Sequence, residues 1–187
     1  MAQFNAFEDA IDFSFWREIC EAYGERVRFS RGDFFVRAGE VLRRAGWIVT
    51  GGFKHSLTDS AGNAKSVGFV FGNSILANYM SVMLGHTMPT DIIALEDSEV
   101  LVVPAALIRE RLVCDPTLNL RFAQALFDQA YSQALDVYRS TPQERYNKLL
   151  KRFPRIFDLV PLGEIASYLN ISRRQLHRFR ELPRSGE

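Results

Sequence analysis

The stretch from Arg26 to Val103 restricts the fold most, because it consists of short β-rich runs separated by glycine and polar turns. Residues 59–63 (DSAGN) stand between two of these runs and predict a hairpin loop. Many short strands at close spacing are typical of a β-barrel or a jelly roll. We therefore expect an N-terminal β-roll built from the runs RVRFS, DFFVRA, GWIVT, GFKHSL, KSVGFVF, DIIAL and SEVLVV.

Helices are predicted on both sides of this β-rich stretch. Before it, apolar residues recur with helical spacing and predict an amphipathic lead-in helix over residues 4–23. After Pro104 the pattern becomes helical, with a short helix expected over residues 107–112. A longer helix is expected from Asp115 to about Arg139, with Pro116 at its first position.

The long helix is apolar on two sides. Leu118, Phe122, Ala125 and Leu126 lie roughly opposite a stripe with 3-4 spacing, at about 100° per residue. We expect the β-roll to cover one side and a second copy of the helix to cover the stripe, as in a coiled coil. The alternative is a helix buried within one larger domain. The stripe consists of Leu120, Ala123, Phe127, Ala130, Ala134 and Val137.

A new helix is predicted where residues 140–142 (STP) break the long one. Thr141 can cap it, with Pro142 at the first helical position and Glu144 at the third, which completes a capping box. Its expected inward residues are Tyr146, Leu149, Leu150 and Phe153, and its outward cations are Lys148, Lys151 and Arg152.

Two short helices joined by a tight turn are predicted next. The first covers residues 162–169, and Asn170 follows where the chain must reverse, because Asn tolerates the left-handed conformation well. Ser172 caps the second helix through Gln175, again with capping-box spacing. A basic second helix after such a turn is typical of a helix-turn-helix.

The residue types of the second helix suit contact with DNA. Arg can donate two hydrogen bonds to guanine O6 and N7, and Gln can pair with adenine, but the cap competes for Gln175. Arg180 and the basic residues of the preceding helix suit phosphate contacts. The alternative is a solvated two-helix corner in an ordinary helical domain. The candidate DNA-binding residues are Ser172, Arg173, Arg174, Gln175, His177 and Arg178.

The formal net charge of +1 conceals an asymmetry along the chain. Residues 1–139 hold 13 Lys or Arg and 17 Asp or Glu, a net charge of −4. Residues 140–187 hold 10 and 5, a net charge of +5. An acidic body with a basic end is expected when one part of a protein contacts nucleic acid, although a basic end can also be merely solvated.

Other classes of protein find little support in the sequence. The isolated Cys20 and Cys114 indicate a reducing compartment, and the three histidines lack metal-ligand spacing, so we expect no metal and no cofactor. No run is apolar enough to cross a bilayer and the start lacks the parts of a signal peptide, so we expect a cytoplasmic protein without membrane contact. No catalytic motif appears, so we expect no enzyme. A cupin-like metal enzyme on the β-roll and an interaction module that does not read DNA are the alternatives.

The order of β-roll, long helix and helix-turn-helix resembles the Crp/Fnr family of bacterial transcription regulators over essentially the whole chain. The matching pieces are Gly39-Glu40 and residues 92–100 (IIALEDSEV), 144–154 (ERYNKLLKRFP) and 165–178. The resemblance implies an α+β fold with three parts. These are an N-terminal double-stranded β-helix or jelly-roll domain of the cyclic-nucleotide-binding type (1–113), a dimerisation helix (114–139) and a C-terminal winged-helix-like helix-turn-helix domain (140–187).

The same resemblance implies how such a protein works. It implies a homodimer that binds a near-palindromic operator in double-stranded DNA under the control of a small-molecule effector sensed by the β-roll. RNA polymerase is a further partner that the resemblance suggests.

Two departures from the family pattern affect these expectations. The family commonly has Ser-Arg-Glu in the recognition helix, but Arg174 replaces the Glu, and an Arg cannot accept a hydrogen bond from cytosine. The family's usual target sequence is therefore not expected. The Arg-Ser pair that holds the phosphate of cyclic AMP falls at Met88 and Pro89, and the Glu that holds its ribose falls at Asn78. Because Met has no charge and Pro has neither hydroxyl nor N–H, we expect an effector other than cyclic AMP.

Overall fold

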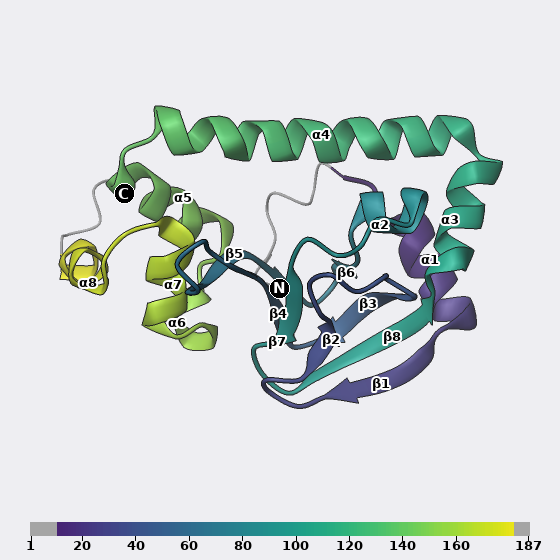
Figure 1. The fold of residues 1–187 in the computed structure, drawn as a ribbon, viewed down its shortest axis with the longest axis horizontal. Coiled ribbons are helices and arrows are strands. Elements are labelled where there is room, and N and C mark those ends of the chain that lie inside the picture. Colours follow the sequence, from purple (N-terminus) through teal and green to yellow (C-terminus); the bar gives the residue numbers. More distant parts are fainter. Residues whose placement is uncertain (1–10, 182–187) are drawn as a thin grey trace.

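The computed structural model describes residues 11–181, and its N-terminal part is a roll of two four-stranded antiparallel sheets (Figure 1). One sheet has the order β1-β8-β3-β6 and the other the order β2-β7-β4-β5. This confirms the predicted β-roll. The strands are β1 (Glu25–Phe29), β2 (Phe34–Val36), β3 (Arg44–Thr50), β4 (Gly52–Thr58), β5 (Ala64–Phe71), β6 (Ile75–Leu76), β7 (Asp91–Ala94) and β8 (Ser98–Pro104).

The helices confirm the predicted α+β architecture. In Figure 1, α4 runs along the top of the molecule from α3, beside the roll, to α5, and the last four described helices gather at the far end. The helices are α1 (Ser14–Tyr23), α2 (Tyr79–Leu84), α3 (Ala105–Cys114), α4 (Pro116–Arg139), α5 (Pro142–Arg152), α6 (Ile156–Leu159), α7 (Leu162–Leu169) and α8 (Arg173–Glu181).

Local sequence signals set several of these boundaries. A carboxylate oxygen of Asp59 accepts hydrogen bonds from the backbone N–H groups of Ala61 and Asn63, at 3.0 and 2.8 Å, which closes the predicted hairpin loop between β4 and β5. Thr141 and Glu144 form the predicted capping box at the start of α5. Such bonds satisfy backbone donors that a helix end or a turn leaves without a partner.

Four features differ from the sequence-based expectation. The lead-in helix begins at Ser14, whose backbone N–H donates to Asp12, and the predicted segment before residue 11 lies outside the described residues. The helices α2 and α6 and the strand β6 were not expected, because six, four and two residues are too few to show a period.

The two sides of α4 have different environments, as the sequence predicts. Phe122 is buried, and its ring centroid lies 5.3 Å from that of Phe15 and 6.0 Å from that of Tyr79. Leu118, Ala125 and Leu126 on the same side pack against the core of the roll. The predicted stripe on the other side contacts little, since Leu120 and Phe127 are 59% and 65% exposed.

A bulge in β5 decides which side chains of the roll face the helical domain. The register pairs His55 with Gly68 and Ser56 with Ser66, so Val67 between them is an extra residue. An extra residue shifts the alternation of the two sides of a strand by one. One face therefore carries Lys54, Ser56, Ser66, Phe69 and Phe71.

This face of β4 and β5 completes the core of the C-terminal helices. Phe69 and Phe71 of β5, together with Leu95, are buried in one cluster with residues of α5 to α8. Phe53, on the opposite face of β4, belongs to the core of the roll instead. The sheet thus separates two hydrophobic cores and contributes side chains to both.

Candidate DNA-binding site

The helices α7 and α8 form the predicted helix-turn-helix. Asn170 adopts the left-handed conformation, with φ 52° and ψ 48°, and its backbone N–H donates to the carbonyl of Ser167 at 3.0 Å. The next N–H, that of Ile171, donates to the carbonyl of Ala166 at 3.0 Å. These bonds satisfy carbonyls at the end of α7 while the chain reverses, so that α8 begins three residues later.

The predicted capping box at the start of α8 is also present. The backbone N–H of Gln175 donates to Ser172 Oγ at 3.1 Å, and Gln175 Oε1 accepts from the backbone N–H of Ser172 at 3.0 Å. Both side chains therefore use their polar atoms to hold the end of the helix. This answers the question that the sequence left open for Gln175, whose acceptor oxygen is occupied by the cap.

The outward face of α8 carries three of the candidate residues. Arg174, His177 and Arg178 have the i, i+3, i+4 spacing of one helix face, and all three side chains are exposed. On the other side, Leu176 and Phe179 are buried in the core of the helical domain. The helix is thus fixed along one side and presents two guanidinium groups and an imidazole along the other.

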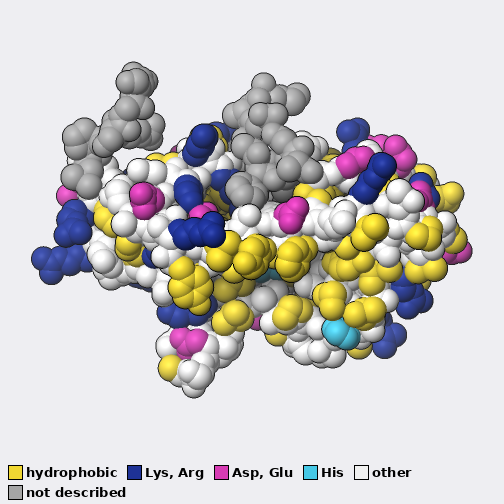
Figure 2. Space-filling model, turned by 90° about the horizontal axis from the view of Figure 1, so that it is seen from above, with side chains coloured by type: hydrophobic (Ala, Val, Ile, Leu, Met, Phe, Trp, Pro, Cys, Tyr) yellow, Lys and Arg dark blue, Asp and Glu magenta, His cyan; other side chains and the backbone are white. Residues whose placement is uncertain are grey.

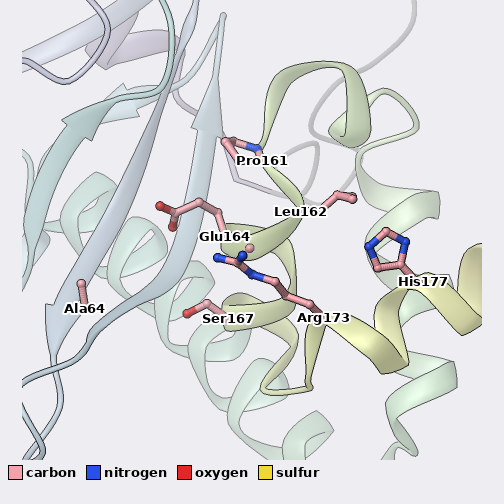
Figure 3. A pocket seen from close by; sticks show the side chains of 8 residues that line it. Ala64, Pro161, Leu162, Glu164, Ser167, Arg173 and His177 are labelled. Carbon is pink, nitrogen blue, oxygen red and sulfur yellow. The ribbon is translucent and has the colours of Figure 1, made fainter.

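Arg173 lies apart from this group. Its guanidinium folds back over α7, and a Cβ added at Gly163 would lie only 2.6 Å from Arg173 Nη2. Figure 3 shows this side chain beside Glu164 and Ser167, while His177 projects from the next turn of α8. A cavity of about 620 Å³ lies here, between the start of α7, the start of α8 and Ala64 at the edge of the β4–β5 hairpin.

Two further exposed cations near the helix-turn-helix make contacts within the protein. The guanidinium of Arg180 lies 4.9 Å from the ring centroid of Phe157, a cation–π contact. In α5, Lys148 Nζ pairs with Asp136 at 2.6 Å. Arg178 makes a longer contact of the same kind, with its guanidinium 6.0 Å from the ring centroid of Phe179.

The helix-turn-helix is docked on the roll through polar contacts that the sequence analysis missed. Lys54 Nζ lies 2.5 Å from Glu164 Oε1, and the hydroxyl of Ser66 donates to the other oxygen of Glu164. The backbone N–H of Ser66 donates to Ser167 Oγ at 3.0 Å. Beside them, the rings of Phe69 and Tyr168 lie 5.1 Å apart.

Glu164 is therefore the centre of this docking contact. Burial raises the pKa of its carboxyl, but the hydrogen bonds from Lys54 and Ser66 outweigh burial and hold the pKa below its ordinary value of 4.5. No signal in the sequence could have paired these residues, because Lys54 and Glu164 are 110 positions apart and the bulge at Val67 sets the face.

The residues expected at an effector pocket have separate environments. The carboxamide oxygen of Asn78 caps α2 by accepting from the backbone N–H of Ser81 at 3.0 Å. Met88 is buried in the core of the roll, whereas the neighbouring Pro89 is exposed. Nearby, burial lowers the pKa of His55 to about 4, and its Nδ1 lies 3.2 Å from Thr90 Oγ1.

Within residues 11–181, no group of three or more His, Cys, Asp or Glu side chains is placed to hold a metal ion. In the same range, none of the helices combines the length and the apolar character that crossing a bilayer requires.

Comparison with known proteins finds one matching family model and several solved structures of similar fold. The family model of the cyclic nucleotide-binding domain matches residues 26–112. FixK2 from Bradyrhizobium japonicum is similar in structure, with a TM-score of 0.67 and 16% identity over 88% of this chain and 89% of that chain. The c-di-GMP responsive global regulator CLP from Xanthomonas campestris has a TM-score of 0.65 and 12% identity, over 90% of this chain and 89% of that chain. The catabolite activator protein from Thermus thermophilus has a TM-score of 0.55 and 16% identity, over 88% of this chain and 80% of that chain. A comparison with curated proteins finds no match.

The fold and the exposed α8 define a class of protein in which a β-roll is joined by one long helix to a helix-turn-helix. Residues 26–112 match the model of the cyclic nucleotide-binding domain, and the chain as a whole has the fold of Crp/Fnr-type regulators. The resemblance seen in the sequence is thereby confirmed.

The docking contact predicts a dependence on pH. Docking lowers the pKa of the Glu164 carboxyl. The contribution of the ionised carboxylate to the stability of docking is therefore fully present above pH 4.5, and it is lost as the pH falls through the lower pKa of the docked state. Glu164→Gln should loosen docking above pH 4.5 and remove this dependence. We expect exchange of the Ser66 amide to be at least tenfold faster in this variant at pH 6, since a hydrogen bond to a charged group contributes about 1.5–3 kcal/mol.

The matched control is Glu110→Gln, which changes the same group on the exposed surface of α3. Hydrogen exchange of the backbone amides, measured by NMR or mass spectrometry, distinguishes the two variants. Equal exchange at Ser66 in both variants would mean that Glu164 does not hold the domains together.

Proposed function

We propose that the protein is a DNA-binding transcription regulator of the Crp/Fnr type that acts as a homodimer on a near-palindromic operator. The observation that carries this proposal is the capped helix α8, held by Leu176 and Phe179, with Arg174, His177 and Arg178 exposed together. An α-helix fits the major groove of DNA, where Arg can recognise guanine through two hydrogen bonds.

The contacts that each side chain makes within the protein suggest its role. Arg174 and Arg178 are the base-reading residues, with His177 between them on the same face. Ser172 and Gln175 hold the start of the helix through the cap. Arg173 and Arg180 suit phosphate contacts, which fix register and orientation without reading sequence. Because Arg174 replaces the family's Glu, the operator differs from the family's usual target.

The exposed stripe of α4 supports the homodimer. Figure 2 looks down on the α4 side and shows hydrophobic side chains gathered on this face. Leu120 and Phe127 have most of their surface exposed, and Tyr131 stacks on Phe127 with ring centroids 5.7 Å apart. Single exposed apolar residues are ordinary, but a continuous apolar face on a helix marks an interface. A second α4 would cover it and place two copies of α8 roughly 34 Å apart, in successive major grooves.

Regulation is proposed to act through the contacts between the roll and the helix-turn-helix. An effector sensed by the roll would shift the β4–β5 face, and the contacts of Lys54 and Ser66 with Glu164 would transmit the shift to α7. Residues 139–142 would serve as the hinge. The effector is proposed to differ from cyclic AMP, because Met88 and Pro89 offer no charge to a phosphate. RNA polymerase is the further protein partner that a regulator of this type would contact.

Two other functions are alternatives to a DNA-binding regulator. A cupin-like metal enzyme needs closely spaced His and Glu ligands, and none of the groups within residues 11–181 meets this need. A protein-interaction module that keeps the architecture without reading DNA differs from a regulator in one measurable property. It would lack binding to duplex DNA that falls steeply with salt.

The first test is a selection of random duplexes by the purified protein at two salt concentrations. The proposal predicts enrichment of a two-fold symmetric site, with an affinity that decreases steeply as salt increases, because counterions are released when phosphates are neutralised. Negligible affinity for any duplex, even at low salt, would favour the interaction module.

A second test separates base reading from phosphate contact. Arg178→Ala should weaken binding to the selected site by about 1–3 kcal/mol and should leave binding to random duplex nearly unchanged. Arg180→Ala is the matched comparison, since it should weaken both kinds of binding by similar factors. Fluorescence anisotropy with labelled duplexes measures all four affinities. If Arg178→Ala lost equal affinity for the two duplexes, Arg178 would be a phosphate-contacting residue and not a base-reading one.

A third test addresses the dimer. Phe127→Glu places a charge in the proposed helix pair, so it should shift the protein from dimer to monomer in analytical ultracentrifugation. Ser132→Glu adds the same charge to an exposed position of α4 outside the stripe and should leave the mass unchanged. A wild-type protein that sediments as a monomer at high concentration would contradict the homodimer.

A further inference from the structure

Tyr138, in the last turn of α4, has an aromatic ring that lies in solvent. The residue is 88% exposed, the largest fraction among the large hydrophobic residues within residues 11–181. In the same range, its ring makes no stacking contact and its hydroxyl makes no hydrogen bond. Tyr131, one heptad earlier, is 56% exposed and stacks on Phe127. An uncovered ring at the end of an apolar helix face is suited to contact with a partner, because aromatic side chains bury a large apolar area.

A cleft of about 510 Å³ lies beside this turn, between α4, α5 and α7. Val67 at the bulge of β5 and Val137 of α4 line it, and they are 45% and 58% exposed. Leu149 of α5 and Tyr168 of α7 add further apolar surface to the lining. Covering this surface would be favourable in proportion to the area removed from water.

Most of the basic side chains in the lining have partners within the protein. Arg145 Nη1 donates to the carbonyl of Ser140 at 2.8 Å. Lys148 Nζ pairs with Asp136 at 2.6 Å, and the guanidinium of Arg152 lies over the ring of Phe153, 4.8 Å from its centroid. The exposed apolar side chains, and not these cations, are therefore the part of the lining that lacks a partner.

The register of the α4 stripe relates Tyr138 to this cleft. If Ala134 and Val137 of the stripe take the a and d positions of a heptad, Gln133 takes the preceding g position and Tyr138 the following e position. In a parallel pair of helices, the e residue of one helix lies beside the g residue of the other. Gln133 and Val137 both line the cleft. The e residue of a second α4 would therefore lie at the opening of the cleft.

We propose that Tyr138 of a second copy inserts into this cleft, and that Tyr138 of the first copy occupies the same cleft of the second. This inference rests on the proposed homodimer. The exchange is reciprocal, because a two-fold interface uses the same surface on both copies. The inserted ring packs against Val67, Val137 and Tyr168. A cleft of this size accommodates a whole small molecule, so it admits one aromatic ring.

The inserted ring connects three parts of the other protomer. Val67 belongs to the roll, Val137 to the long helix and Tyr168 to the helix-turn-helix. The break between α4 and α5 lies beside the cleft, where Lys148 Nζ donates to Ser140 Oγ at 3.0 Å. Each helix-turn-helix is therefore positioned partly by the other protomer, and the two copies of α8 are set relative to each other by the dimer itself.

The first test measures dimer dissociation of the full chain by analytical ultracentrifugation. Tyr138→Ala should raise the dissociation constant of the dimer roughly tenfold or more, because a buried tyrosine is a typical anchor of an interface. The matched control is Tyr23→Ala, which removes the same ring from the end of α1, where it is 71% exposed. It should change the constant less than about twofold, as is usual at a surface position.

A double-mutant cycle tests the contact itself. Val67→Ala should also weaken the dimer, although Val67 lies on β5 and outside the α4 stripe. The double variant with Tyr138→Ala should weaken the dimer less than the product of the two single effects, because the two side chains share one contact. Independent effects that multiply would overturn the insertion.

A photo-crosslink identifies the neighbours of residue 138. Tyr138→p-benzoylphenylalanine should give covalent dimers joined to peptides that contain Val67 or Tyr168. Covalent dimers joined only within α4 would overturn the insertion, as would equal dissociation constants of Tyr138→Ala and Tyr23→Ala, and both results would leave the homodimer intact. A wild-type protein that is monomeric would overturn the homodimer and this inference together.

Discussion

The arrangement of the protein depends on one face of the β4–β5 hairpin, because this face is the wall between two hydrophobic cores. Phe53 points into the roll, whereas Phe69 and Phe71 on the opposite face are buried among the C-terminal helices. Removing this face from water is the principal apolar gain that holds the helix-turn-helix against the roll. The ion pair between Lys54 and Glu164 fixes the orientation of that contact, because a hydrogen bond requires a defined geometry and apolar packing does not.

The helix α4 imposes a second constraint, and the two constraints work together. Its first half is anchored to the roll through Phe122, and its last turn is tied to α5 by the pair of Asp136 with Lys148. The helical domain is thus held at two places, by the β4–β5 face and by the end of α4. A change in either contact should change the position of α8, because Leu176 and Phe179 of α8 are buried in the core that these contacts complete. This is the physical basis for placing regulation there.

Features encoded by neighbouring residues could be predicted from the sequence, and features created by distant residues could not. The structure confirms three features that residues close together in the sequence determine. These are the capping box of Thr141, the left-handed Asn170 and the two sides of α4. The docking of Glu164 could not be predicted, because it depends on the bulge at Val67. Without that extra residue, the alternation of β5 would place Ser66 and Phe69 on opposite faces.

The candidate DNA-binding residues show why residue type alone does not assign a role. Arg173, Arg174 and Arg178 are chemically identical and lie on one helix, yet only the last two share the outward face. Arg173 falls where α8 meets α7, and the missing side chain of Gly163 lets its guanidinium settle there. Gln175 has the chemistry to recognise adenine, but its oxygen already accepts from the backbone of Ser172. The neighbours of a side chain therefore decide whether it supports the recognition helix or remains free to contact a ligand.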